Sequence, residues 1–180
     1  MKKRILGVLR VAVLLLISAL CLSFVSCGAR GSVGAGEVLS AMLACEEDLP
    51  VGVIYFSGAE EGEKGYLSES LCIALYGDEG VPAEWSFVSD FAIYLSASGH
   101  PFELAVFRCD MSDGTEEVSE LCARRLAVLR NHFRGSDYEA YTSGGRVVIL
   151  GSCVLMIVSS DAEISLSEAR DAVGGFFRQK

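Results

Sequence analysis

The amino-acid sequence predicts an α+β domain built on a four-stranded, mainly antiparallel sheet. Two observations favour this class. Four strand-like apolar segments occur in two pairs, and a pattern of apolar residues at helical spacing follows each pair. In chain order these six segments span residues 87–95, 102–109, 113–134, 146–150, 153–159 and 165–177. A strand-strand-helix unit that occurs twice predicts two hairpins in one sheet, with the helices packed against it.

An additional helical part precedes these units. Apolar residues recur at helical spacing in 37–47, and Pro50 ends that pattern. The short apolar run 51–56 is compatible with a strand or with an extended packing segment. After a glycine-rich, charged loop at 58–65, the segment 67–77 predicts a second short helix.

The later segments carry more specific signals. Asp113, with Glu116 three residues further on, is typical of a helix N-terminus, and Ser165 with Glu168 predicts a capping box at the start of the last helix. The long helix presents an apolar stripe formed by Val118, Leu121, Cys122, Leu126, Leu129 and Phe133. The strand pair at 146–159 is almost continuously apolar, which predicts central positions in a sheet that is at least partly covered on both faces.

The N-terminus has the order of a secretory signal peptide. A basic start, 1-MKKR-4, precedes the uninterrupted apolar run Val11–Val25. This run is shorter than the roughly 20 residues of a spanning helix and suits a signal peptide. The basic start predicts that the rest of the chain lies outside the cytoplasm.

The end of this run, 22-LSFVSCGARG-31, resembles the bacterial lipoprotein lipobox, in which the cysteine becomes the lipidated first residue. Ser26 precedes Cys27 and Gly28 follows it, whereas Phe24 departs from the leucine that the motif prefers. A diacylglyceryl group on Cys27 would supply two acyl chains, enough for stable membrane anchoring.

Other fates of the leader remain open from the residues alone. Cys21 is a poorer lipidation site because the bulky Leu20 comes directly before it. Ordinary cleavage near Ala29 and retention of an uncleaved anchor that begins at Ile5 are the alternatives to lipidation at Cys27.

Three segments follow from these signals. Residues 1–26 are expected to be the signal peptide, and 27–36 the lipidated cysteine with a small, glycine-rich tether. Residues 37–180 are expected to form a single α+β domain, a length that suffices for one core.

The charge of the chain bears on its partners. The net charge is −9, and four of the 15 Lys and Arg lie in residues 1–26, which contain no acid. A chain that starts at Cys27 therefore has 11 basic and 24 acidic residues, a net charge of −13. Such a surface repels phosphate backbones, so no nucleic-acid partner is expected.

The sequence contains no recognisable catalytic set. Its histidines are His100 and His132, no G-x-S-x-G element presents a serine, and no C-x₂-C pair suggests a metal. We therefore expect no catalytic residues, no metal ligands and no cofactor. The alternative is a small extracytoplasmic hydrolase in which a Cys or Ser is assembled in space with His100.

The remaining cysteines and one aromatic segment complete the candidates. Cysteines of the expected domain read as apolar core residues, and the sequence leaves open whether a disulfide forms among Cys45, Cys72, Cys109, Cys122 and Cys153. The segment 137-DYEAY-141 and the loop 58–65 are the places where a partner groove is most expected.

The pattern as a whole resembles an uncharacterised family of small Gram-positive bacterial lipoproteins, classed as a domain of unknown function. The resemblance covers roughly residues 37–177. It follows from 75-LYG-77, 103-ELAVF-107, 131-NHF-133, Tyr138 with Tyr141, and the strand pair around Gly151. It implies a small, exported, lipid-anchored protein, and it carries no catalytic residue, ligand or partner.

Taken together, these features predict a lipid-anchored binding or accessory module on the outer face of the cell membrane. Its membrane contact is expected to be the lipid at Cys27, and a protein or a cell-wall component is expected as its partner.

Overall fold

A computed structural model describes residues 33–78, 83, 85–97, 99–110 and 112–178 of the chain. The predicted signal peptide, 1–26, and the predicted lipidation site, Cys27, lie outside the described residues. Val33 and Ala35 are buried in a hydrophobic core, and the first described helix begins at Ala35. The end of the predicted tether, 27–36, therefore overlaps the start of the folded part.

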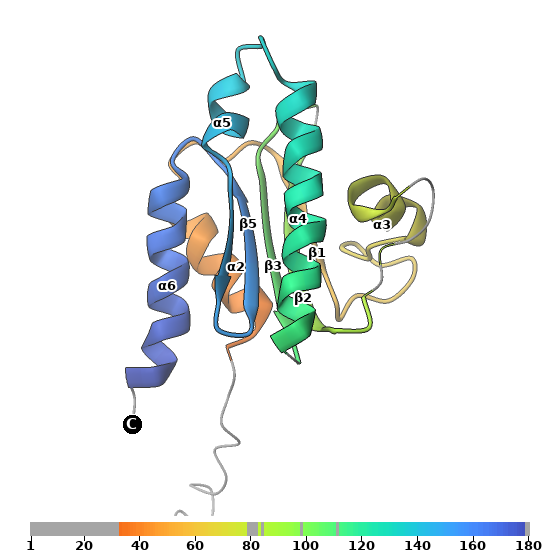
Figure 1. The fold of residues 1–180 in the computed structure, drawn as a ribbon, viewed down its shortest axis with the longest axis vertical. Coiled ribbons are helices and arrows are strands. Elements are labelled where there is room, and N and C mark those ends of the chain that lie inside the picture. Colours follow the sequence, from red (N-terminus) through yellow and green to blue (C-terminus); the bar gives the residue numbers. More distant parts are fainter. Residues whose placement is uncertain (1–32, 79–82, 84, 98, 111, 179–180) are drawn as a thin grey trace, which may run out of the picture. The chain divides into compact units, whose positions relative to one another are not determined.

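The centre of the fold is an antiparallel sheet in the order β1-β2-β3-β5-β4 (Figure 1). Every neighbouring pair of strands is antiparallel. The strands are β1 Gly52–Phe56, β2 Val88–Ser96, β3 Glu103–Cys109, β4 Arg146–Leu150 and β5 Cys153–Val158. The α+β class and the antiparallel sheet are thus confirmed.

The predicted number of strands was wrong, because the sheet has five strands rather than four. The additional strand is β1, the apolar run after Pro50. It pairs with β2, residue Gly52 opposite Ser96 and Phe56 opposite Ala92. A helix and a long connection separate these two strands in the sequence, so no hairpin signal identifies the pair.

Helices cover both faces of this sheet (Figure 1). Helices α2 and α6 pack on one face, and α4 packs on the other face with α3 beside it. The short helix α5 connects α4 to β4. The helices are α2 Ala35–Ala44, α3 Glu69–Tyr76, α4 Ser112–His132, α5 Glu139–Gly144 and α6 Ala162–Arg178.

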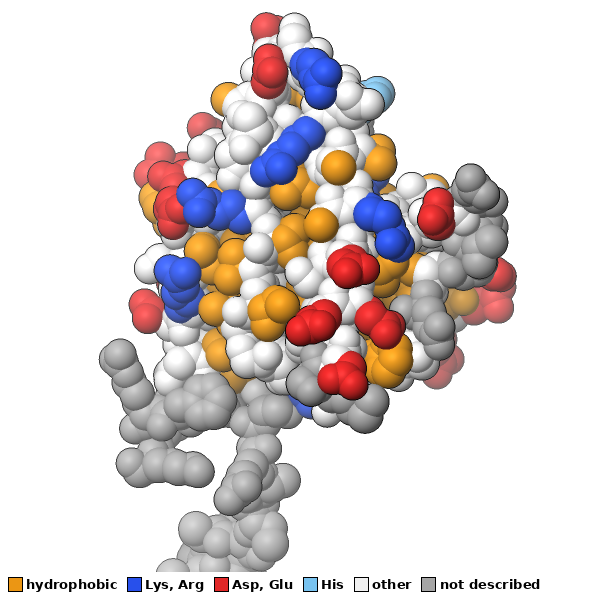
Figure 2. Space-filling model, in the orientation of Figure 1, with side chains coloured by type: hydrophobic (Ala, Val, Ile, Leu, Met, Phe, Trp, Pro, Cys, Tyr) orange, Lys and Arg blue, Asp and Glu red, His pale blue; other side chains and the backbone are white. Residues whose placement is uncertain are grey.

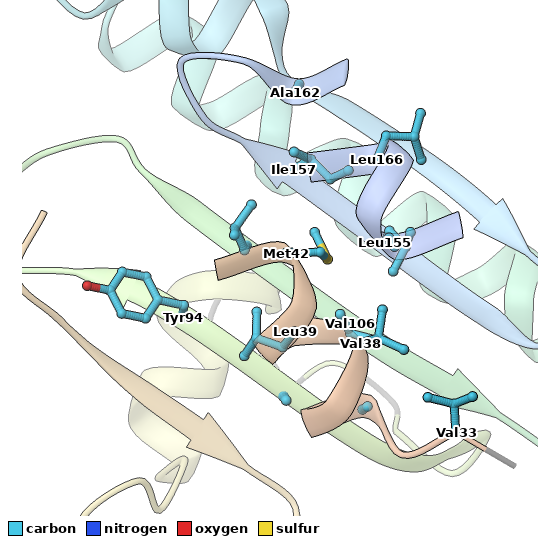
Figure 3. Packing of buried hydrophobic residues seen from close by; sticks show 14 of the residues in the cluster. Val33, Val38, Leu39, Met42, Tyr94, Val106, Leu155, Ile157, Ala162 and Leu166 are labelled. Atoms are coloured by element: carbon cyan, nitrogen blue, oxygen red, sulfur yellow. The ribbon is translucent and has the colours of Figure 1, made fainter. Parts of the chain in front are cut away.

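The core on the first face, which we call the α2 face, joins two helices to the middle of the sheet. Figure 3 shows Val38, Leu39 and Met42 of α2 directed at strand residues such as Val106 and Leu155. These five side chains are at most 1% exposed. Burying such a side chain contributes roughly 1.5–3 kcal/mol, so α2 is held by packing.

The core on the opposite, α4 face confirms the long amphipathic helix. Its buried residues recur at helical spacing and are Val118, Cys122, Leu126 and Leu129. They pack on strand residues that include Ala105, Phe107, Met156 and Val158. An aromatic group adjoins them, in which Tyr76, Trp85 and Phe107 make edge-to-face contacts at centroid distances of 5.3–5.7 Å.

The predicted capping box at Ser165 and Glu168 was wrong. Helix α6 starts three residues earlier, and the backbone N–H of Ile164 donates to Asp161 Oδ1 at 3.2 Å, which is an N-cap interaction. Ser165 is instead buried inside the helix, where its hydroxyl donates to Glu46 Oε1 at 2.6 Å.

The two strands of the last hairpin differ in position. The sequence predicted central places for both, and β5 is central, with all six of its residues buried. Strand β4 is an edge strand of the sheet. Its apolar character reflects the helix layers above it, because Val147 packs towards the α4 face whereas Val148 and Leu150 pack towards the α2 face.

Candidate functional site: an apolar groove beside α2

The helix layer on the α2 face stops short of β1. Strand β1 shares this face through Ile54 and Phe56, because they lie opposite the buried residues Tyr94 and Ala92 of β2. Ile54 is 42% exposed and Phe56 is 41% exposed. Two large apolar side chains in register on one strand are therefore left in solvent.

A groove of about 440 Å³ lies between this strand and α2. Its walls include Gly36, Leu39 and Ser40 of α2, Ile54 and Phe56 of β1, and Asp90 of β2. The predicted partner loop, 58–65, borders the groove through Gly58. The rest of the groove was not predicted, since its walls come from three segments far apart in the sequence.

Both oxygens of the Asp90 carboxylate in the groove already accept hydrogen bonds from within the protein. Asp90 Oδ2 accepts a hydrogen bond from the backbone N–H of Ala35 at 2.7 Å, and Oδ1 accepts one from the Ser57 hydroxyl at 2.6 Å. The N-cap residue of α2 is Gly34, which has no side chain to perform this role. Asp90 therefore caps α2 from β2 and fixes the helix against the sheet.

The start of β1 is held by a tyrosine. The hydroxyl of Tyr94 donates to the carbonyl oxygen of Pro50, and its ring lies over Gly52. A Cβ atom on Gly52 would approach Tyr94 Cζ to 2.6 Å and the Leu95 carbonyl oxygen to 2.4 Å. Glycine is thus required at this position, and the strand enters the sheet at a fixed register.

The end of β1 is held by the loop that follows it. The backbone N–H of Phe56 donates to the carbonyl oxygen of Gly65 at 3.1 Å. Gly65 has φ of +97°, and a Cβ atom there would lie 2.7 Å from Phe56 Cε1. The loop therefore runs along the outer edge of the strand and fixes the Phe56 ring at the end of the groove.

The other predicted partner segment, 137–141, packs against His100. The imidazole ring of His100 lies 4.5 Å from the ring of Tyr138 and 4.9 Å from that of Tyr141, between centroids. Its Nδ1 accepts a hydrogen bond from the backbone N–H of Phe102 at 3.1 Å, and burial lowers the pKa of His100. These contacts describe a neutral imidazole that holds a turn.

The hydrolase alternative requires a nucleophile activated by this imidazole. Ser96 does approach His100, but its hydroxyl donates to the backbone carbonyl oxygen rather than to the ring. Burial raises the pKa of the thiols at Cys45, Cys72, Cys109, Cys122 and Cys153, and all five are free in the structure. A raised pKa disfavours the thiolate that acts as a nucleophile. Among the described residues, these contacts do not favour the hydrolase.

A buried ionic group on the α4 face was not predicted. Glu103 is 2% exposed, and its Oε2 accepts hydrogen bonds from Arg125 Nη2 at 2.8 Å and Nε at 3.0 Å. The hydroxyl of Tyr76 donates to Glu103 Oε1 at 3.1 Å. Burial opposes a charge on Arg125, but attraction to Glu103 outweighs it, so the pKa of Arg125 is raised. The sequence feature that could have indicated this ionic group was the acidic residue Glu103 within the apolar segment 102–107.

Among the described residues, no group of three or more His, Cys, Asp or Glu could hold a metal ion. None of the described helices is both long and apolar enough to cross a bilayer.

Comparisons with known proteins add no relative. No protein-family model, no curated protein and no solved structure matches the chain. The resemblance to Gram-positive lipoproteins therefore stays a prediction from the sequence, and the groove beside α2 is the feature on which a function can be argued.

Proposed function

We propose that this protein is a lipid-anchored module, outside the cytoplasm, that binds a partner protein through the groove beside α2. The observation that supports binding is the uncovered face of β1. Ile54 and Phe56 stand in register, 42% and 41% exposed, beside a groove of about 440 Å³. Clustered exposed apolar side chains beside a groove are typical of interaction surfaces, whereas single ones are ordinary.

A protein partner suits this groove better than a cell-wall glycan. Recognition of a glycan needs polar groups that are free to bind its hydroxyls. The carboxylate oxygens of Asp90 are used by Ala35 and Ser57, and the Ser40 hydroxyl donates to the Gly36 carbonyl oxygen at 2.7 Å. The groove thus offers mainly apolar contact, which suits apolar side chains of another protein.

The location follows from the leader and is tested separately. We expect Cys27 to carry a diacylglyceryl group after removal of residues 1–26. Intact-mass analysis of the membrane fraction should show that added mass, and Cys27→Ala should lose it. Cys21→Ala is the matched control and should keep it.

Protease treatment of intact cells tests the orientation. The folded part should be digested from outside, while a cytoplasmic marker survives. An unchanged mass in Cys27→Ala would overturn the anchor, and protection of the folded part would overturn the outward orientation.

A further inference from the structure

We propose that the groove beside α2 binds an amphipathic helix of a partner protein, with an apolar stripe turned to β1 and Lys and Arg residues beside it. This inference rests on the proposed binding role and does not depend on the lipid anchor. The proposed partner segment is a helix, and it carries positive charge.

The shape follows from the incomplete helix layer. Neighbouring strands lie about 4.8 Å apart and packed helices 8–10 Å apart, so one helix covers about two strands. Helix α2 packs on β2 and β3, and α6 packs on β5 and β4. The fifth strand, β1, is left without a helix on this face. One more helix beside α2 would complete the layer.

The flank of α2 that lines the groove is suited to such a neighbour. It presents Gly36 and Ser40, one helical turn apart and both exposed. Small side chains at this spacing allow a second helix backbone to come close. The floor below it is provided by Ile54 and Phe56, which would be covered by the apolar stripe of the incoming helix.

A strand added to the edge of β1 fits less well. The bonds from Ser57 N–H to the Phe91 carbonyl and from Ala97 N–H to the Val51 carbonyl show which residues of β1 bond to β2. In an antiparallel pair, every second residue bonds to the neighbouring strand, so the backbone N–H and C=O groups of Ile54 and Phe56 point away from β2, towards the open edge of the sheet. The outward N–H of Phe56 is taken by Gly65, so the 58–65 loop blocks part of this edge.

The charge follows from the acids at both ends of the groove. The loop after β1 exposes Glu60, Glu61 and Glu63 together with Lys64, a net charge of −2 from three acids and one base, and Glu37 lies in the first turn of α2. Glu47 and Asp48 follow the other end of α2 and are also exposed. Helix α2 has ten residues, so a helix of its length beside it would span about 15 Å between these two groups.

The same acids argue against a second copy of the chain as the occupant. Two copies that met at this groove would bring the acidic loops together, and each copy from Cys27 onward carries a net charge of −13. A partner with Lys and Arg on its polar face would instead meet opposite charge, which speeds association and fixes the orientation.

The test uses two peptide probes and the full chain in nanodiscs of phosphatidylcholine, with empty nanodiscs as the baseline. Both probes are fluorescent amphipathic peptides of about 18 residues, with Leu at i, i+3 and i+4 spacing. One carries Lys at the polar positions and the other carries Glu. Fluorescence anisotropy should show that the Lys peptide binds at least about tenfold more tightly than the Glu peptide.

Two variants test the groove itself. Ile54→Asp removes an apolar contact from its floor, and Ser40→Trp fills it from α2; each should weaken binding of the Lys peptide by at least about tenfold. The matched control is Ile149→Asp on β4, at the opposite edge of the sheet. Ile149 is 43% exposed, as much as Ile54, and its replacement should change binding less than about twofold.

Charge reversal tests the acidic loop. Replacing Glu60, Glu61 and Glu63 by Lys should weaken binding of the Lys peptide by at least about tenfold and reduce its salt dependence. The control reverses the same number of charges at Glu116, Glu117 and Glu120. Figure 2 shows acidic side chains gathered over the first half of α4, on the face away from α2. This control has the same net charge and should bind nearly as wild type.

Circular dichroism of each variant shows whether it is folded, and Ser40→Trp keeps the test intact if Ile54→Asp does not fold. Equal binding of both peptides would overturn the positive charge. Unchanged binding in both groove variants would overturn the site, and self-association lost in Ile54→Asp would make a second copy the occupant. If the Cys27 mass test fails, the same anisotropy measurement can be made with the full chain in buffer or detergent instead of nanodiscs, so the two proposals fail separately.

Discussion

Removal of Arg125 should destabilise the fold far more than removal of the arginine beside it. Arg125 Nη2 lies 2.8 Å from Glu103 Oε2, and the side chains are 16% and 2% exposed. In Arg125→Ala, Glu103 keeps the hydrogen bond from Tyr76 but loses its cation and all three guanidinium hydrogen bonds. A buried carboxylate would then lack its counter-charge.

Breaking a buried ion pair by removing one partner costs about 3–5 kcal/mol. Because Arg125 is partly exposed, water can enter the space that it leaves, so we expect the lower end, about 3 kcal/mol. That is a large share of the roughly 5–15 kcal/mol that stabilises a domain. Arg124→Ala, at an exposed neighbouring position, should cost less than about 0.5 kcal/mol.

A double-mutant cycle measures the coupling. Denaturant unfolding can be followed through the fluorescence of Trp85, the single tryptophan, whose ring lies 5.7 Å from that of Tyr76. Glu103→Leu with Arg125→Met and Tyr76→Phe should be close to wild type in stability, because replacing every partner of a buried polar group by apolar residues is often neutral. Without Tyr76→Phe, the buried Tyr76 hydroxyl would lose its acceptor, at a cost of about 1–3 kcal/mol. A cost below about 1 kcal/mol for Arg125→Ala, or strictly additive single variants, would refute this reasoning.

Two further predictions concern titration and thiol chemistry. Burial lowers the pKa of His100 from its usual value of 6.5, so stability is fully present above that pH and is lost as the pH falls through the folded value. The free energy of unfolding, measured as the pH is lowered, should therefore decline less in His100→Gln than in wild type. If His100→Gln declined as much as wild type and His132→Gln declined less, the assignment of this pH dependence to His100 would be contradicted. Thiol labelling of the native protein, followed by peptide mapping, should find the partly buried Cys45 and Cys72 modified. The buried Cys109, Cys122 and Cys153 should be modified only on unfolding. Labelling of Cys122 at the rate of Cys45 would contradict the packing.

Local patterns predicted the parts of the fold that depend on local spacing. Four of the six residues of the predicted stripe, Val118, Cys122, Leu126 and Leu129, are buried, because residues three and four apart share a helix face. Leu121 and Phe133 are only partly buried. Both expected strand pairs form, since their apolar runs are separated by turns. Helix α5 was not expected, because 139-EAYTSG-144 contains weak helix formers.

Tertiary contacts hold α5 in place and are not visible in its own sequence. Arg130 Nε donates to the Thr142 carbonyl oxygen at 3.0 Å, and its Nη2 donates to the Gly145 carbonyl oxygen at 2.7 Å. These bonds satisfy the Gly145 carbonyl and give a second donor to the Thr142 carbonyl, which also accepts the Gly145 N–H at 3.2 Å. The prediction failed here because an arginine from another helix supplies the cap.

The groove depends still more on distant pairing. The sequence pointed to the loop 58–65, and its first residue, Gly58, does border the groove. The larger part depends on the placement of β1 at the edge next to β2 and on Asp90 of β2, which caps α2 from 55 residues away. Neither contact leaves a periodic signal, so the apolar run 51–56 read equally well as a packing segment.

The two edges of the sheet show why an exposed apolar residue on β1 differs from one on β4. On β4, Ile149 is exposed alone, while Val148 and Leu150 beside it pack under the α6 side of the core. On β1, Ile54 and Phe56 are exposed together on the face where α2 ends the helix layer, and Tyr94 and Gly65 contact the strand at its two ends. Exposed apolar side chains that adjoin a groove favour an interaction surface more than a single exposed one does, so the packing supports the proposed site at β1 rather than one at β4.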